Sequence, residues 1–125
     1  MKKLIAFFEI PATDFYRAVD FYETVLNMKL SVFECEQEKM ACFTEGSETV
    51  GAISQSFDLL PDFLPSEKGV LIHFNTDNIA TTLERVLQKG GKVLIPCTKI
   101  EADGKGYFAV FVDSEGNRIG IYADK

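Results

Sequence analysis

The same succession of sequence patterns occurs twice along the 125 residues, and this internal repeat limits the fold more than any other feature. Residues 7–14 (FFEIPATD) and 70–77 (VLIHFNTD) are each typical of a strand that ends at a Thr-Asp pair, which favours the start of a helix. Apolar residues then recur at helical spacing until Asn27 in the first half and Gly90 in the second. The chain is therefore expected to hold two copies of one module.

The similarity resumes near the end of each half. Residues 40–43 (MACF) correspond to 108–111 (FAVF), and residues 50–53 (VGAI) correspond to 119–122 (IGIY). Turn-forming residues lie between these segments in both halves. In the second half the turn at residues 115–117, with alternating side chains on either side, is typical of a β-hairpin.

Each half thus follows the order strand, helix, strand, strand, strand. The sequence predicts an α+β fold of two tandem βαβββ modules in one domain, residues 1–125, with module one at 1–60, module two at 66–125 and a linker at 57–68. One four-stranded sheet with a single helix leaves its other face bare. Two such sheets are therefore expected to form a sheet-lined cup that encloses a ligand.

Charge and composition argue against several classes of function. The chain has 13 basic and 19 acidic residues, a net charge of -6, and its basic residues are scattered, so we expect no binding to nucleic acid. The apolar run at the start stops at Glu9, and no segment approaches the length of a membrane span, so we expect no membrane contact and a cytoplasmic location. No G-x-S-x-G motif accompanies the single histidine, which disfavours a serine hydrolase.

The cysteines do not form a metal or disulfide pattern. Cys35, Cys42 and Cys97 are odd in number, lack C-x-x-C spacing and have apolar neighbours. We predict that all three are small core residues.

Three segments resemble a known family: residues 7–30 (FFEIPATDFYRAVDFYETVLNMKL), 90–96 (GGKVLIP) and 106–123 (GYFAVFVDSEGNRIGIYA). They are similar to the vicinal oxygen chelate superfamily, which includes glyoxalases, bleomycin resistance proteins and extradiol dioxygenases, and in particular to its branch related to lactoylglutathione lyase. The R-A-x-x-F-Y segment that begins at Arg17 and the D-x-E-G-N-R-x-G segment that begins at Asp113 are specific when they occur together. The resemblance implies the cup-shaped fold and a homodimer, but not a reaction.

The resemblance also implies where a metal would bind. Metal-using members place one ligand on the first strand and one on the last strand of each module. These positions correspond here to Phe7, Gly51, Leu71 and Gly120, none of which binds a metal through its side chain. We therefore expect no metal cofactor.

Two polar residues remain near these positions. Alternate residues of a strand share a face, so Glu9 is expected beside Phe7, and His73 beside Leu71, both inside the cup. His73 is predicted to give or take a proton near neutral pH, with Glu9 as its partner or as a base. The alternatives are a hydrogen-bonded structural histidine and a Glu9 carboxylate that pairs with Arg17 or Arg118.

The remaining predicted ligand contacts are mostly apolar. Ser54 or Gln55 could add a hydroxyl or an amide, Tyr107 and Tyr122 could hydrogen-bond a ligand, and a loop at 99–106 could close over the cup with Lys105 facing an anion. The full set of predicted ligand-binding residues is Phe7, Phe43, Gly51, Ile53, Gln55, Leu71, Phe108, Gly120 and Tyr122.

Three functions are compatible with these residues. The first is a metal-free protein that binds a small, largely apolar molecule in the cup. The second is a glyoxalase-type isomerase or lyase that uses Glu9 and His73 as an acid-base pair. The third is a sensor or partner-binding module without catalysis.

Overall fold

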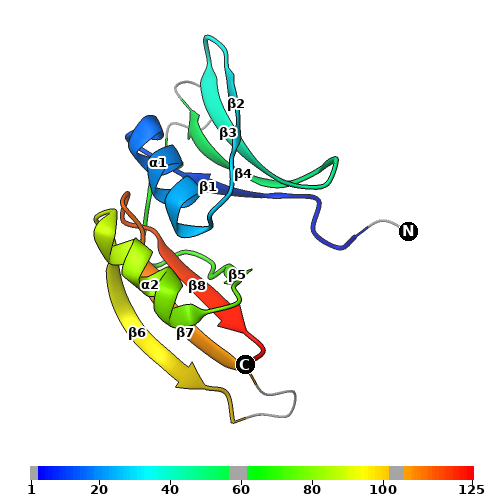
Figure 1. Ribbon diagram of the computed structural model, residues 1–125. Helices are drawn as coiled ribbons and strands as arrows, with labels where there is room; N and C mark the ends of the chain where they lie inside the picture. The colour runs from blue at the N-terminus through cyan, green and yellow to red at the C-terminus, as the bar shows by residue number, and fades with distance from the viewer. Residues whose placement is uncertain (1–2, 57–61, 102–105) are drawn as a thin grey trace.

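Each half of the chain forms a four-stranded sheet with one helix against it, as Figure 1 shows. The computed structural model describes residues 3–56, 62–101 and 106–125. The first module consists of β1 (Phe8–Pro11), α1 (Phe15–Val25), β2 (Ser31–Glu34), β3 (Glu38–Glu45) and β4 (Glu48–Ser56). The second consists of β5 (His73–Asn75), α2 (Ile79–Gln88), β6 (Lys92–Lys99), β7 (Tyr107–Val112) and β8 (Arg118–Ala123). The predicted α+β fold with a repeated βαβββ order is confirmed.

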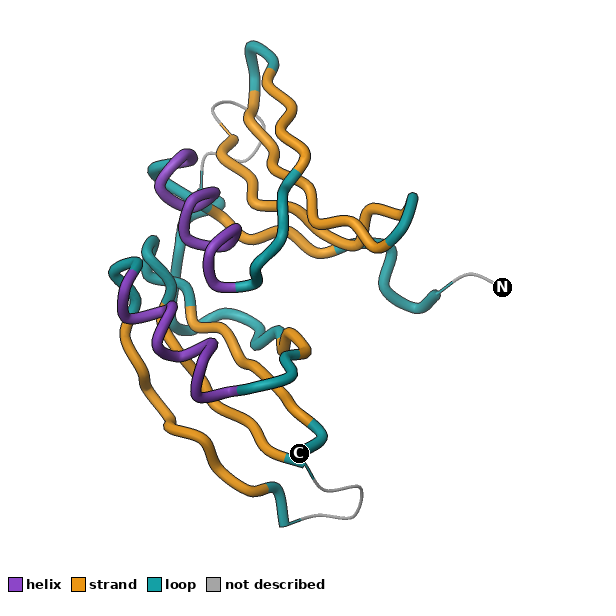
Figure 2. The backbone as a smooth tube through the Cα atoms, viewed as in Figure 1, coloured by secondary structure: helices purple, strands orange, loops and turns teal. Residues whose placement is uncertain are grey.

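The two sheets have the same topology. Their strand orders are β1-β4-β3-β2 and β5-β8-β7-β6, and in each sheet the first strand runs parallel to the last while the other pairs are antiparallel. Strands β1 and β5 are thus edge strands. The two helices lie next to each other on one side of the molecule, on the left of Figure 2, with a sheet beside each.

The helices begin and end where local chemistry requires it. Asp14 caps α1, because its Oδ1 accepts a hydrogen bond from the Arg17 amide at 3.2 Å. The cap of α2 is Asn78, one residue after the predicted Thr-Asp pair, and its Oδ1 accepts from the Thr81 amide at 3.0 Å. After α1 the chain turns at Asn27 with φ of 52°, and after α2 at Gly90 with φ of 90°, as the sequence predicted.

An aromatic cluster joins the modules. Phe8 and Phe43 of the first module stack against Phe74 of the second, with ring centroids 5.6 to 5.7 Å apart, and the fully buried Tyr22 of α1 lies 6.1 Å from Phe74. Such ring pairs stabilise a core beyond the area that they bury. One continuous hydrophobic core therefore runs through both modules.

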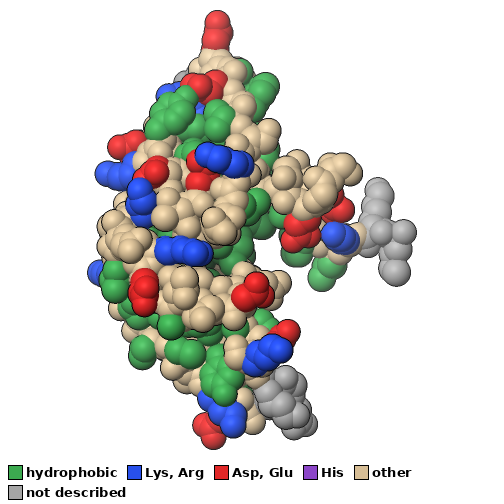
Figure 3. Space-filling view, in the orientation of Figure 1, with side chains coloured by type: hydrophobic (Ala, Val, Ile, Leu, Met, Phe, Trp, Pro, Cys, Tyr) green, Lys and Arg blue, Asp and Glu red, His purple; other side chains and the backbone are tan. Residues whose placement is uncertain are grey.

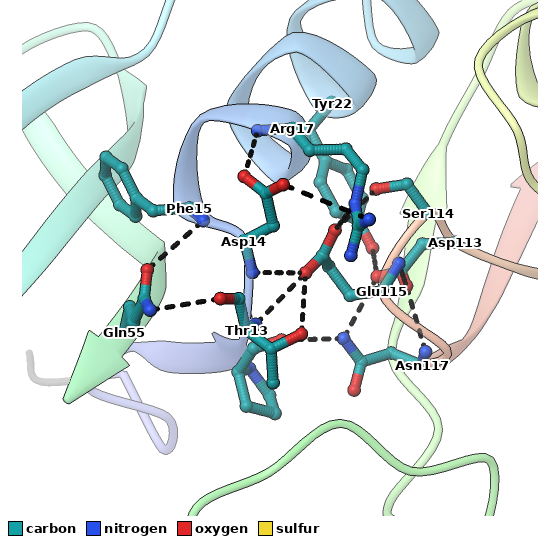
Figure 4. A network of polar contacts seen from close by, with 11 residues as sticks. Thr13, Asp14, Phe15, Arg17, Tyr22, Gln55, Asp113, Ser114, Glu115 and Asn117 are labelled. Carbon is teal, nitrogen blue, oxygen red and sulfur yellow. Dashed lines mark hydrogen bonds and ion pairs between the residues drawn. The ribbon is translucent and has the colours of Figure 1, made fainter. Parts of the chain in front are cut away.

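A polar network adds a second connection between the modules, drawn in Figure 4. The turn between β7 and β8 brings Asp113, Glu115 and Asn117 against the start of α1. The Tyr22 hydroxyl donates to the buried Asp113 carboxylate, and the Asn117 amide donates to the Pro11 carbonyl at 2.8 Å. Burial and the negative charge of Asp113 raise the pKa of Tyr22 well above its usual range, so this phenol stays protonated.

Glu115 is the centre of this network. Its Oε1 accepts hydrogen bonds from the amides of Thr13 at 3.0 Å and Asp14 at 2.8 Å, and its Oε2 lies 2.6 Å from Arg17 Nε. Burial alone would raise the pKa of Glu115, but the hydrogen bonds from Arg17 and Asp14 and the charge of Arg17 together lower it. A carboxylate from module two thus stabilises the first turn of the helix in module one.

Some sequence predictions about local structure are wrong. The apolar run that ends before Glu9 is not a strand over its whole length: Leu4 and Ile5 are exposed, because β1 pairs with β4 only from Phe8 onward. Cys35 and Cys97 are exposed rather than in the core, because Cys35 follows the edge strand β2 and Cys97 lies on the edge strand β6.

The described segments leave two predictions outside their range. Lys105 and the rest of residues 102–105, half of the loop at 99–106, lie beyond the described residues, as does the first part of the linker at 57–68. None of the described helices is both long and apolar enough to span a membrane.

Candidate functional site

A groove of about 1210 Å³ lies between the two modules. Its walls come from the segment that leads into β1, the end of α1, the turn between β3 and β4, the segment around β5 and one face of α2. In Figure 3 the surface is hollowed on the right, between the segment that leads into β1 and the second module. The edge strands β1 and β5 thus both contribute to the walls of this groove.

Five of the predicted site residues meet in this groove. Glu9 and His73, the predicted acid-base pair, both line it. Phe7, Phe43 and Leu71 supply part of its apolar surface, and Phe7 is 53% exposed even though it is aromatic. Residues that the sequence repeat predicted on equivalent strands of the two modules therefore line the same groove.

Glu9 has a partner on the neighbouring strand. Its Oε1 accepts a hydrogen bond from the Ser54 hydroxyl at 2.7 Å. The proposed alternative, an ion pair with an arginine, is not formed, because Arg17 binds Glu115 and Arg118 donates to the Gly69 carbonyl at 2.9 Å. The half-buried Glu9 carboxylate is thus oriented by a neutral donor rather than neutralised by a cation.

His73 lies across a glycine. It pairs in register with Gly120 of β8, and a Cβ added at Gly120 would lie 2.3 Å from His73 Nδ1. The same sheet face carries Phe108, whose ring centroid is 6.5 Å from that of His73. The imidazole is exposed to solvent. It lies directly over Gly120, and the side chain of any other residue at that position would clash with it.

The register corrects the predicted match between the modules. Glu9 pairs with Ala52, as His73 pairs with Gly120, so Ala52 and not Gly51 is the counterpart of Gly120. Aligning the two glycines in VGAI and IGIY was wrong by one residue. The equivalence of Glu9 and His73 is nevertheless present in the structure.

With the corrected register, three residues that were predicted to contact a ligand lie on the sheet face opposite to Glu9. Gly51 pairs with the core residue Phe43, Ile53 is fully buried, and neither points into a cup on the face of Glu9. The Gln55 amide holds the start of α1, since it accepts from the Phe15 amide at 3.2 Å and donates to the Thr13 carbonyl at 3.1 Å. Their predicted role in the cup therefore fails because alternate strand residues face opposite ways.

Phe108, Gly120 and Tyr122 lie on the predicted face of the second sheet but do not line the groove. A hydrogen bond to Asp124 is the main reason why the pKa of Tyr122 is raised. Tyr107, the other tyrosine considered, packs against the hydrophobic core. These residues are therefore not brought together with Phe7, Phe43 and Leu71.

Sequence reasoning missed one wall of the groove. Asn78, Thr81, Thr82 and Arg85 of α2 line it, at the spacing of residues that share one helix face. Thr81 and Arg85 were visible in the sequence as polar positions away from the apolar residues of the helix, whereas Thr82 is buried together with Ile79 and Val86. What could not be seen was that the end of α1 would lie beside this face of α2.

The donor set gives a direct test of whether a metal fits. Among the described residues, no three His, Cys, Asp or Glu side chains gather closely enough to hold an ion. Glu9 and His73 alone fall short of the three or so protein ligands that a divalent ion takes. The residues of the groove do not fit the metal that the resemblance implied, and metal-free binding stays a prediction.

Comparison with known families agrees with this architecture. The model of the Glyoxalase/Bleomycin resistance protein/Dioxygenase superfamily matches residues 4–121. The chain belongs to this superfamily. A search of curated proteins finds no match.

Solved structures show the same superfamily fold at low sequence identity. A glyoxalase/bleomycin resistance protein from Albidiferax ferrireducens T118 has a TM-score of 0.72 and 15% identity, over 97% of this chain and 99% of that chain. A glyoxalase/bleomycin resistance protein/dioxygenase family enzyme from Burkholderia phytofirmans has a TM-score of 0.68 and 16% identity, over 96% and 98%.

A glyoxalase I variant from Zea mays has a TM-score of 0.70 and 20% identity over 93% of this chain. The match spans only 45% of the maize chain. At such identities the likeness is one of fold, and the superfamily includes many reactions, so the function has to be argued from the groove itself.

Proposed function

We propose that this superfamily member binds a small, largely apolar molecule in the groove between its modules, without a metal. The observation that carries the proposal is the groove itself: about 1210 Å³, with aromatic and aliphatic side chains from both modules such as Phe7, Leu71 and Phe74, and with polar and charged side chains, Glu9 and His73 among them, making up about half of its lining. Ligand sites of proteins are typically large clefts with mostly apolar walls and few polar groups.

The exposure of apolar side chains around the groove supports this proposal. Phe7 is 53% exposed and Val70 is 90% exposed, whereas comparable residues in the core are buried. Leaving such surface in water is unfavourable by about 25 cal/mol per Å². A ligand that covers these side chains would recover that free energy.

A neutral fluorescent probe, N-phenyl-1-naphthylamine, tests the proposal. We expect saturable binding to the protein, and weaker binding after Phe7→Ala, which removes a ring from the groove. Phe33→Ala is the matched control, because Phe33 is 56% exposed but does not line the groove. Equal affinity in both variants, or no saturable binding at all, would contradict the proposal.

Metal-free binding has its own measurement. Elemental analysis of protein purified without chelators is expected to show no stoichiometric nickel, zinc, iron or manganese. One equivalent of any of these ions, lost in the Glu9→Gln/His73→Gln double variant, would overturn this part of the proposal.

A second candidate function is proton transfer at a carbon next to a carbonyl. It is favoured by one observation, that Glu9, oriented by Ser54, and His73 line the same groove. The test follows deuterium uptake from D₂O into small 2-hydroxyketones and hemithioacetals by NMR. Uptake that disappears in both Glu9→Gln and His73→Gln, but not in the exposed Glu36→Gln control, would support an isomerase or lyase. Unchanged uptake would leave a binding protein or a non-catalytic sensor.

A homodimer is part of the proposal. Leu4 is 99% and Ile5 is 65% exposed, next to the open edge of β1, which offers an apolar surface to a second copy. Light scattering coupled to gel filtration is expected to give twice the chain mass. A monomer at micromolar concentration would remove this part.

A further inference from the structure

One cation in the groove has no counter-charge. Arg85 of α2 is half-buried and lines the groove, and within the described part of the chain its guanidinium makes no ion pair or hydrogen bond. Most arginines at such depth hold a carboxylate or a carbonyl, as Arg17 and Arg118 do here. The planar donor group of Arg85 is therefore available to something in the groove.

A second donor lies one helical turn away on the same face. Thr81 precedes Arg85 by four residues, so the two side chains are neighbours on the surface of α2, and both line the groove. The amide of Thr81 is used by the Asn78 cap, but its hydroxyl makes no hydrogen bond within the described residues. The Thr82 hydroxyl, in contrast, is already hydrogen-bonded: its Oγ1 lies 2.7 Å from Thr76 Oγ1 and donates to the Asn78 carbonyl at 3.0 Å.

The acidic residues of the groove are arranged so that they do not neutralise Arg85. Glu45 and Glu48 lie at the end of the groove formed by the turn between β3 and β4, where Glu48 is paired with Lys3 at 3.0 Å and Glu45 lies beyond ion-pair distance of Arg85. Glu9 accepts from Ser54 on β4. Asp77, which precedes α2, is exposed and lies beyond ion-pair distance of Arg85. In Figure 1 the turn between β3 and β4 lies well away from α2.

We infer that the ligand of the groove is an amphipathic acid, whose carboxylate or similar anion is bound by Arg85 with help from the Thr81 hydroxyl while its apolar part lies against the aromatic residues. This inference rests on the proposed function and names the chemical class of its ligand. Arginine suits the task because its planar fork binds the two oxygens of a carboxylate at once.

Two probes that differ by one charged group test the inference. N-phenyl-1-naphthylamine is neutral, and 1-anilinonaphthalene-8-sulfonate has the same two ring systems with a sulfonate added. We expect the wild-type protein to bind the sulfonate probe more tightly. Arg85→Gln should weaken that probe by a factor of about ten and change the neutral probe by less than twofold.

Two further variants separate charge from geometry. Arg85→Lys keeps the charge but not the planar fork, so it should show an intermediate affinity for the sulfonate probe. Thr81→Val should weaken the sulfonate probe by a few-fold. Lys99→Gln is the matched control, since it removes one positive charge from β6, outside the groove, and should change neither probe.

The possible outcomes distinguish failure of the acid-binding inference from failure of the proposed function. Binding of the neutral probe with no preference for the sulfonate, or a sulfonate affinity that Arg85→Gln leaves unchanged, overturns the acid-binding inference and leaves the groove as a site for neutral molecules. Loss of both probes in Arg85→Gln also overturns it, because Arg85 then shapes the groove rather than binding a charge. Failure of the wild-type protein to bind either probe removes the proposed function itself.

Discussion

Removal of the Glu115 carboxylate is expected to lower the stability of the protein more than removal of an exposed glutamate. Glu115 Oε1 accepts from two amides, at 2.8 and 3.0 Å, and Oε2 pairs with Arg17 at 2.6 Å. Hydrogen bonds to a charged group each contribute about 1 kcal/mol or more, while an ion pair whose arginine is half-exposed adds at most about 1 kcal/mol. Glu115→Ala should therefore reduce the free energy of unfolding by about 2.5 kcal/mol.

This free energy converts into a measurable shift in Tm. At about 2.1 cal/mol/K per residue, 125 residues give an unfolding entropy of about 260 cal/mol/K, so 1 kcal/mol corresponds to about 4 °C. Calorimetry should show a decrease of about 10 °C for Glu115→Ala. Glu115→Gln retains an oxygen acceptor and should lose about 4 °C. The exposed Glu84→Ala is the control, with an expected change below about 2 °C.

The effect should depend on pH in one direction. The pKa of Glu115 in the folded protein lies below its ordinary value of 4.5, so the folded state binds this proton less tightly than the unfolded state. Its stabilising contribution is complete above pH 4.5 and is lost as the pH falls through the folded pKa. The difference in Tm between wild type and Glu115→Gln should be largest near pH 7 and should become smaller as the pH falls below 4.5. A difference that is absent at pH 7, or that grows as the pH falls below 4.5, would refute the reasoning.

Three other changes test separate features of the fold. Tyr22→Phe leaves the buried Asp113 carboxylate without its phenol donor and should lower the free energy of unfolding by about 2 kcal/mol in urea titrations, whereas no change would mean that water replaces the phenol. Gly51→Ala places a Cβ 2.3 Å from the Phe8 ring and should destabilise by about 1–3 kcal/mol in the same assay, a loss that Phe8→Leu in the same chain should reduce if the clash is the cause. Asn78→Ala removes the cap of α2 and should destabilise by about 1 kcal/mol, with the exposed Gln88→Ala as the control.

Much of the fold followed from the repeat, because hydrophobic period and turn residues are local properties of a sequence. The helix ends at Asn27 and Gly90 are examples, since each residue adopts the left-handed conformation that its type tolerates. Strand register was less accessible. Phe43 pairs with Gly51 while its counterpart Phe111 pairs with Ile119, so an alignment that matched the two glycines was displaced by one residue.

The site could be predicted only in part, for the same physical reason. Glu9 and His73 were found because strand alternation determines which side chains share a face. Arg85 was not found, because its place in the groove depends on how α2 lies against the end of α1, which no local pattern determines. Phe74 was missed likewise, since its contacts with Phe8 and Phe43 come entirely from the packing of one module on the other.

The position of Glu115 also means that the two modules, although built on one plan, are no longer interchangeable. Helix α1 receives the carboxylate at its first turn from the other half of the chain, while α2 is capped by Asn78 and supported by Thr76 of its own half. A chain divided in the linker would therefore yield unequal pieces. The piece with α1 would lack part of its own helix start, and only reunion with the second piece would restore it.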